Sequence, residues 1–195
     1  MNLTLLTGPV RSGKSELGQR LAARTGLPVT VAVAGAASDP EMELRIARHR
    51  RVRPEGWSTL ELTPALLDHP DGPAAWMRSV PPGDVLLVDC LGTLLAALLA
   101  VHGEFADAVV PEEQRCYEAT SAAVVEALVA RVGQTIVVSN EVGWGVVPAY
   151  PSARLFRDAL GRANRDLAAI ADRALLVVAG RALDLKAFPS IEETS

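Results

Sequence analysis

A glycine-rich stretch near the start of the chain has the residue types that bind phosphate. Residues 8–15 read GPVRSGKS, which matches the pattern G-x-x-x-x-G-K-[ST]. In such a loop, successive backbone N–H groups turn inward around phosphate oxygens at the N-terminus of a helix. Lys14 can reach the β- and γ-phosphates, and the Ser15 hydroxyl can ligate Mg²⁺. The stretch therefore predicts a nucleoside triphosphate site. The residues assigned to it are Gly8, Pro9, Val10, Arg11, Ser12, Gly13, Lys14 and Ser15.

An acidic residue at the end of another apolar run is the expected partner of this loop. The run VLLVD ends at Asp89, where a carboxylate can hold Mg²⁺ through water while nucleotide is bound. The alternative role for Asp89 is the ordinary N-cap of the following helix. Ligands of such folds lie beyond the carboxyl ends of the strands. We therefore expect Ala34, Gly35, Asn140 and Glu141 to face the same crevice, and we assign Ala34 and Gly35 to the nucleotide site.

One histidine lies within a run of arginines and could act as a nucleophile. The stretch at 41–53 reads EMELRIARHRRVR, and on a helix Glu41, Arg45 and His49 share a face. The nearby positive charges disfavour protonation of His49. A neutral imidazole beside phosphate-binding arginines can attack phosphorus and form a covalent intermediate. The arginines that could hold the triphosphate and the pyrophosphate leaving group are Arg50, Arg51 and Arg53. By itself the stretch favours a second interpretation, a solvated helix face.

Apolar runs and helical patterns alternate along the chain and must position these groups. Strands are predicted at 2–7, 29–35, 57–63, 84–90, 134–140, 174–180 and 182–186. Helices are predicted at 14–25, 39–51, 93–102, 112–132 and 152–171, with Ser152 as a possible cap and a further short helix near residue 74. Strands that lack apolar–polar alternation are typical of a parallel sheet covered on both faces. The pattern predicts a single α/β domain over residues 1–195 with helices on both sides of a mainly parallel sheet.

Composition excludes several other classes of protein. The chain has 195 residues, of which 49% are hydrophobic and 22% are charged, with a net charge of −4. These values argue against disorder, a nucleic-acid-coating protein and a polybasic membrane binder. Cys90 and Cys116 lack metal-site or CxxC spacing, and the longest apolar run is too short to span a bilayer. We expect a cytoplasmic protein without nucleic-acid partners and without stable membrane insertion.

A second glycine-rich segment follows the strand predicted at 134–140. VVSNEVGWGVVP begins at the strand end, where Asn140 and Glu141 can point into the crevice. Its glycines and proline shape a loop that could cover a substrate. Arg154, Arg157 and Asn164 follow on the next predicted helix. An ordinary loop followed by a solvated helix explains the same residues equally well.

These motifs occur in a recognisable order. GPVRSGKS, RIARHRRVRPEGW, VLLVDCLGT, VVSNEVGWGVVP, ARLFRDALGRAN and LDLK follow one another along nearly the whole chain. In this the sequence resembles the bifunctional adenosylcobinamide kinase / adenosylcobinamide-phosphate guanylyltransferase family of cobalamin synthesis. The segment NEVGWGVVP followed by RLFRDALGRAN is far more specific to this family than the phosphate loop is.

The resemblance implies a RecA-like P-loop fold with three layers and two linked reactions. ATP or GTP phosphorylates adenosylcobinamide, and GTP then guanylylates a histidine with loss of pyrophosphate. The GMP passes to adenosylcobinamide phosphate to give adenosylcobinamide-GDP. The family pattern R-I-x-x-H places the GMP carrier at His49. The resemblance extends the GTP contacts to Arg50, Arg51, Val52, Arg53 and Glu61, and it implies a homo-oligomer, trimers among them.

Two other functions fit parts of the same pattern. A P-loop small-molecule kinase without a covalent intermediate would need the phosphate loop but would give His49 no role. A nucleotide-operated switch or assembly ATPase would hydrolyse nucleotide on contact with a partner, and the sequence has no basic patch or tail for one. His49 in its arginine setting favours the bifunctional transferase.

Overall fold

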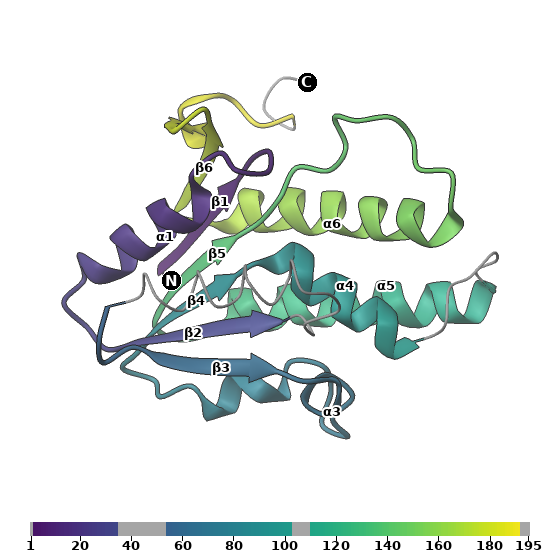
Figure 1. The fold of residues 1–195 in the computed structure, drawn as a ribbon, viewed down its shortest axis with the longest axis horizontal. Helices are drawn as coiled ribbons and strands as arrows, with labels where there is room; N and C mark the ends of the chain where they lie inside the picture. The colour runs from purple at the N-terminus through teal and green to yellow at the C-terminus, as the bar shows by residue number, and fades with distance from the viewer. Residues whose placement is uncertain (1, 35–53, 103–109, 192–195) are drawn as a thin grey trace.

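The computed structural model describes residues 2–34, 54–102 and 110–191 of the chain. Within these residues, seven strands form one sheet in the order β3-β2-β4-β5-β1-β6-β7 (Figure 1). Every pair of neighbouring strands in it is parallel except β6 and β7. The strands are β1 (Asn2–Thr7), β2 (Val29–Ala34), β3 (Ser58–Leu62), β4 (Val85–Asp89), β5 (Gln134–Val138), β6 (Arg173–Val178) and β7 (Arg181–Asp184).

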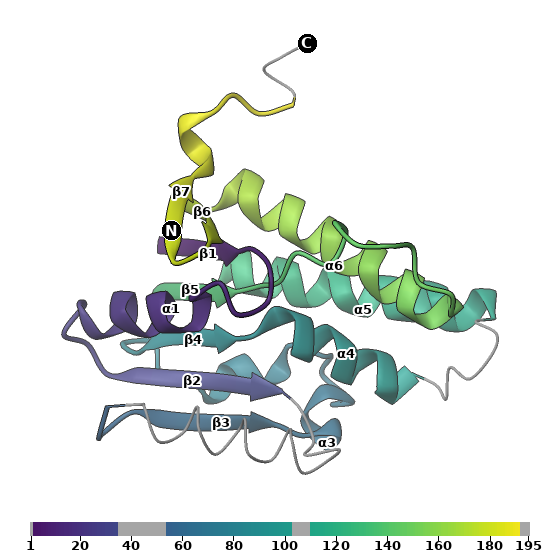
Figure 2. The ribbon, with the colours of Figure 1, turned by 45° about the horizontal axis from the view of Figure 1, so that its top comes forward.

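Helices cover both faces of this sheet. They are α1 (Lys14–Ala23), α3 (Pro64–Leu67), α4 (Leu91–His102), α5 (Pro111–Ala130) and α6 (Pro151–Ile170), with 3₁₀ turns at Ala75–Ser79 and Leu185–Ala187. Figure 2 shows α1 on one side of the sheet and α4, α5 and α6 on the other. The three-layer P-loop-like α/β architecture predicted from the sequence is confirmed.

The strand β4 shows why the apolar runs have no polar alternation. Leu86 and Val88 belong to the core beneath α4, α5 and α6, whereas Val85 and Leu87 belong to the core beneath α1. Successive side chains of a strand point to opposite faces, so a strand covered on both faces is largely apolar along its whole length. Burial of one such side chain contributes roughly 1.5–3 kcal/mol, which makes both layers important for stability.

A close approach of α1 to the sheet fixes where its N-terminus lies. Gly18 is buried in this helix, and a Cβ added there would lie 3.0 Å from Val138 Cγ2 and 3.3 Å from Leu87 Cδ1. A larger residue would push the helix away from β4 and β5. The absence of a side chain at Gly18 therefore helps to hold the start of α1 at the carboxyl edge of the sheet.

The carboxyl ends of three central strands meet at this edge. β5 lies between β1 and β4, and Val138 of β5 pairs with Leu6 on one side and with Asp89 on the other. The loop that follows β1 is therefore separated from Asp89 by one strand width, about 4.8 Å to each side of β5. This topology brings the two predicted phosphate-site motifs together.

Some predicted details are wrong. The strand predicted at 182–186 ends at Asp184, because Lys186 lies in a 3₁₀ turn. Ser152 does not cap α6: the N-cap is Tyr150, and Pro151 occupies the first turn, where its missing N–H costs nothing. The short helix α3 was not predicted.

The helix predicted at 39–51 lies outside the described residues. No helix in the described part of the chain is long and apolar enough to cross a membrane.

Candidate functional site

The predicted phosphate loop connects β1 to α1 as a tight turn. Leu17 N donates to Gly13 O at 2.9 Å and begins the helical ladder of α1. Gly180 N, from the turn between β6 and β7, donates to Ser12 O at 3.0 Å. The loop is thus tied both to its own helix and to a distant turn, which fixes its backbone before any ligand binds. A preformed ring of N–H groups is the arrangement that binds phosphate.

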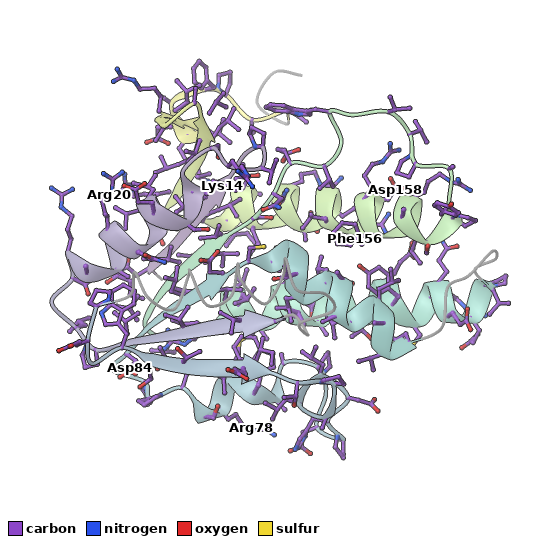
Figure 3. The ribbon with its side chains drawn as sticks, viewed as in Figure 1. Lys14, Arg20, Arg78, Asp84, Phe156 and Asp158 are labelled. Atoms are coloured by element: carbon purple, nitrogen blue, oxygen red, sulfur yellow. The ribbon has the colours of Figure 1, made fainter. Side chains whose placement is uncertain are left out.

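Lys14 lies inside this loop, at the start of α1 (Figure 3). Only 6% of its surface is exposed, and its Nζ donates to Pro9 O at 2.6 Å and lies 3.4 Å from Ser12 Oγ. A buried ammonium group is costly unless polar atoms surround it, and the loop provides them. The structure therefore holds a positive charge at the centre of the loop, where it can pair with phosphate oxygens.

The two residues predicted to hold Mg²⁺ are in direct contact. Ser15 Oγ donates to Asp89 Oδ1 at 2.9 Å, although the residues lie 74 positions apart in the chain. Both side chains are partly exposed at the carboxyl edge of the sheet. A hydroxyl and a carboxylate oxygen are hard donors of the kind Mg²⁺ prefers, so the pair fits that ion. α4 begins at Leu91, so Asp89 lies one residue before the N-cap position of this helix.

The remaining predicted nucleotide contacts divide into two groups. Ala34 and Glu61 lie at or near the carboxyl ends of β2 and β3, on the same edge as Asp89, and Glu61 is exposed. β2 is the direct neighbour of β4, whereas β3 is one strand further out. The others lie outside the described residues: Gly35, His49, Arg50, Arg51, Val52 and Arg53.

A polar network next to the loop was only partly foreseen from the sequence. Asn164 of α6 is 7% exposed, and its Nδ2 donates to Asn140 O at 3.0 Å and to Glu141 Oε1 at 3.1 Å. Its Oδ1 accepts from Ser139 Oγ at 2.5 Å. Thr7 Oγ1 donates to the same Glu141 oxygen at 3.2 Å. Thr7 and Ser139 were not predicted from the sequence as part of the site. Each is a hydroxyl residue at the carboxyl end of a buried strand, and this pattern could have indicated a place in the site.

The arginines on α6 do not share one role. Arg154 Nη1 donates to Pro148 O at 2.9 Å and to Ala149 O at 2.6 Å, so it closes the loop that precedes its own helix. Arg157 Nε lies 3.6 Å from Asp158 Oδ1, a neighbour labelled in Figure 3. For Arg154 the structure favours a loop-shaping role over an ordinary solvated position.

The first glycine of the loop tolerates no side chain. Gly8 has φ +142°, and a Cβ added there would lie 2.2 Å from Val177 O of β6. We expect Gly8→Ala to lower the free energy of unfolding by on the order of 3 kcal/mol or more, because either the loop or β6 must move. Urea unfolding monitored by circular dichroism measures this change.

A second glycine supplies the matched control for this substitution. Gly72 also has a positive φ, +98°, but a Cβ there would meet nothing within 4 Å. Gly72→Ala should lower the free energy of unfolding by only about 1–2 kcal/mol, the cost of placing a residue with a Cβ in a left-handed backbone conformation. If the two variants lost equal free energy of unfolding, the close approach to Val177 O would not be the reason that residue 8 must be glycine.

The chain matches known proteins over most of its length. Residues 4–185 match the family described as cobinamide kinase / cobinamide phosphate guanyltransferase. The bifunctional adenosylcobalamin biosynthesis protein CobP of Pseudomonas aeruginosa is 39% identical over 165 residues, which is 84% of this chain and 86% of the relative. The proteins named CobU from Escherichia coli and Salmonella typhimurium are 35% and 34% identical, each over 86% of this chain and 90% of the relative. The chain therefore belongs to the cobinamide kinase / cobinamide phosphate guanyltransferase family.

Proposed function

We propose that this chain carries out both activities for which its family is named. It first transfers the γ-phosphoryl group of ATP or GTP to the aminopropanol hydroxyl of adenosylcobinamide. It then transfers GMP from GTP, through a histidine, to adenosylcobinamide phosphate, giving adenosylcobinamide-GDP and pyrophosphate. The family match over residues 4–185 supports the pair of reactions. The observation that carries the phosphoryl transfer is the buried Lys14 beside the contact between Ser15 and Asp89.

The loop supplies most of what phosphoryl transfer needs. The transferring group carries negative charge on three oxygens, so catalysis rests on positioning and electrostatic stabilisation. Loop N–H groups hold the phosphates, and Lys14 places a positive charge against them from a site with little water. When bound, Mg²⁺ supplies further positive charge to the β- and γ-phosphate oxygens, and Ser15 and Asp89 are the residues that would hold it.

The second reaction requires a nucleophile, and His49 is our assignment. An imidazole nitrogen of His49 attacks the α-phosphorus of GTP, and the bond to the bridging oxygen breaks as pyrophosphate leaves with the electron pair. A phosphate oxygen of the corrinoid then attacks the same phosphorus, and the nitrogen–phosphorus bond breaks to restore the imidazole. Arg50, Arg51 and Arg53 are proposed to hold the leaving pyrophosphate. These assignments rest on the sequence pattern and the family.

The full set of proposed nucleotide contacts follows from the loop and from the resemblance. It comprises Gly8, Pro9, Val10, Arg11, Ser12, Gly13, Lys14, Ser15, Ala34, Gly35, Arg50, Arg51, Val52, Arg53, Glu61 and Asp89. We further propose that the protein works in the cytoplasm as a single domain over residues 1–195 that forms a homo-oligomer, with a trimer as the expected state.

Product analysis tests the proposal. The protein is incubated with adenosylcobinamide and ATP, and the corrinoid is analysed by mass spectrometry before and after GTP is added. We expect one added phosphate with ATP alone and conversion to the GDP derivative, with release of pyrophosphate, once GTP is present. A corrinoid that remains unchanged with both nucleotides would contradict the proposal. A corrinoid that stops at the monophosphate would reduce the protein to a kinase.

A further inference from the structure

A second carboxylate, besides Asp89, lies against the phosphate loop. Glu141 comes three residues after the end of β5, and its backbone N–H donates to Gly8 O at 3.0 Å. β5 is the strand between β1 and β4, so Glu141 leaves the sheet between the loop and the Ser15–Asp89 contact. Its position is therefore fixed directly to the first residue of the loop that binds phosphate.

One oxygen of this carboxylate is held and the other is not. Glu141 Oε1 accepts two hydrogen bonds, from Thr7 Oγ1 at 3.2 Å and from Asn164 Nδ2 at 3.1 Å. Within the described residues, Oε2 takes part in no hydrogen bond or ion pair. The side chain is also partly exposed at the carboxyl edge of the sheet. Positioning uses Oε1 alone, so the lone pairs of Oε2 remain available to a ligand.

Asn164 acts as a buried clamp on Glu141. Its amide nitrogen uses one hydrogen on Glu141 Oε1 and the other on Asn140 O, while its oxygen accepts from Ser139 Oγ. A side-chain amide has two donor hydrogens and one acceptor oxygen, so this network engages every polar group of Asn164. A buried polar group satisfied on all sides is rigid, because any rotation leaves a partner unpaired. The clamp therefore locks the direction in which Glu141 points.

We propose that Glu141 is the general base of the phosphoryl-transfer step. Oε2 accepts the proton of the corrinoid hydroxyl as the hydroxyl oxygen forms its bond to the γ-phosphorus. The bond from that phosphorus to the β–γ bridging oxygen breaks, and its electron pair leaves with the nucleoside diphosphate. The proton moves to Glu141, so charge and atoms balance. This inference rests on the proposed kinase function, and it names the residue that receives the substrate proton.

The other polar side chains next to the loop are less suited to act as the general base than Glu141. Asp89 is in contact with the Ser15 hydroxyl, on the side of the loop where the metal and phosphates are expected. Lys14 carries the positive charge of the site and cannot accept a proton while charged. Thr7 and Asn164 donate to Glu141 and are positioning residues. A base must lie within hydrogen-bond reach of the hydroxyl, and Glu141 is the carboxylate tied to Gly8.

Glu141→Gln tests the assignment with little change in shape. A glutamine carbonyl oxygen can still accept from Thr7 and Asn164, but its amide nitrogen cannot take a proton. We expect kcat for adenosylcobinamide phosphorylation to fall by about 10²–10⁴-fold, with the KM for ATP changed by less than about 3-fold. Glu126→Gln makes the same chemical change at an exposed position of α5 and should leave kcat unchanged.

A second variant separates a base from a structural role. Glu141→Asp keeps a carboxylate but shortens it by one methylene, which lengthens the contacts with Thr7 and Asn164. If Glu141 is the base, the aspartate variant should be at least about 10-fold faster than the glutamine variant. Incorporation of GMP from labelled GTP, together with thermal unfolding, reports whether each variant keeps its fold and its nucleotide site.

The possible results distinguish this inference from the function on which it depends. Phosphorylation of the corrinoid by the unmodified protein establishes the kinase, whatever the variants do. A glutamine variant within about 3-fold of that kcat would overturn the role of Glu141 alone. A glutamine variant with an unchanged kcat but a raised KM for ATP, or a raised requirement for Mg²⁺, would also overturn this role. That result would make Glu141 a binding residue. Absence of phosphorylation by the unmodified protein would reject the proposed function itself.

Discussion

Lys14→Ala is expected to lower kcat/KM for corrinoid phosphorylation by at least about 10²–10³-fold. Lys14 is 6% exposed and donates to Pro9 O at 2.6 Å, so its ammonium lies inside the loop that would surround the phosphates. Alanine leaves the loop backbone in place but removes the charge that stabilises the transferring phosphoryl group. Transfer of ³²P from γ-labelled ATP to adenosylcobinamide measures the loss.

The chain offers a close control, because it contains only one other lysine. Lys186 is exposed, and its Nζ donates to Ala169 O at 2.9 Å, far in sequence from the loop. Lys186→Ala should leave phosphorylation unchanged. Lys14→Arg should recover little of the rate, since a planar guanidinium is larger than the compact ammonium for which the loop has room. Undiminished phosphorylation by Lys14→Ala would contradict the role of the loop.

His49→Ala is expected to abolish covalent labelling of the protein by α-labelled GTP. The proposed intermediate is a bond between GMP and an imidazole nitrogen, and alanine has no nucleophile to replace it. The measurement is acid-labile radioactivity that remains with the denatured protein. Because the proposed guanylyl transfer passes through this intermediate, the same variant should also fail to form adenosylcobinamide-GDP from adenosylcobinamide phosphate.

His69 provides the control for a change in histidine content alone. Its Nδ1 accepts from Asp71 N at 3.1 Å in an exposed turn that follows α3. His69→Ala should be labelled to the same extent as the unmodified protein. Label that survives in His49→Ala would place the nucleophile at another residue. Absence of label from the unmodified protein would instead favour a single-activity kinase without a covalent intermediate.

The sequence predicted the fold well where physical constraints are local. β1, β2 and β4 are covered on both faces, so their sequences are largely apolar and mark the strands within a residue or two. The phosphate loop is also a local pattern, and it was placed correctly between β1 and α1. Predicting that Ser15 and Asp89 lie together needed one further rule, that ligands bind at the carboxyl ends of parallel strands.

The rest depends on contacts between distant segments. In the sequence, Asn164 cannot be told apart from a solvent-exposed polar residue of a helix. Only the packing of α6 shows that it is buried and donates a hydrogen bond to Glu141. The close approach of Gly8 to Val177 O exists because β6 lies beside β1, which no local pattern reveals. The antiparallel direction of β7 was equally inaccessible, since its four residues are exposed and carry no burial pattern.

The most direct test of the two linked transfers follows a single labelled GMP from protein to corrinoid. The protein is loaded with α-labelled GTP, separated from free nucleotide and pyrophosphate, and mixed with adenosylcobinamide phosphate without further GTP. The proposed function predicts that the label leaves the protein and appears, one for one, in adenosylcobinamide-GDP. Label that stays on the protein, or that leaves only as free GMP, would contradict it.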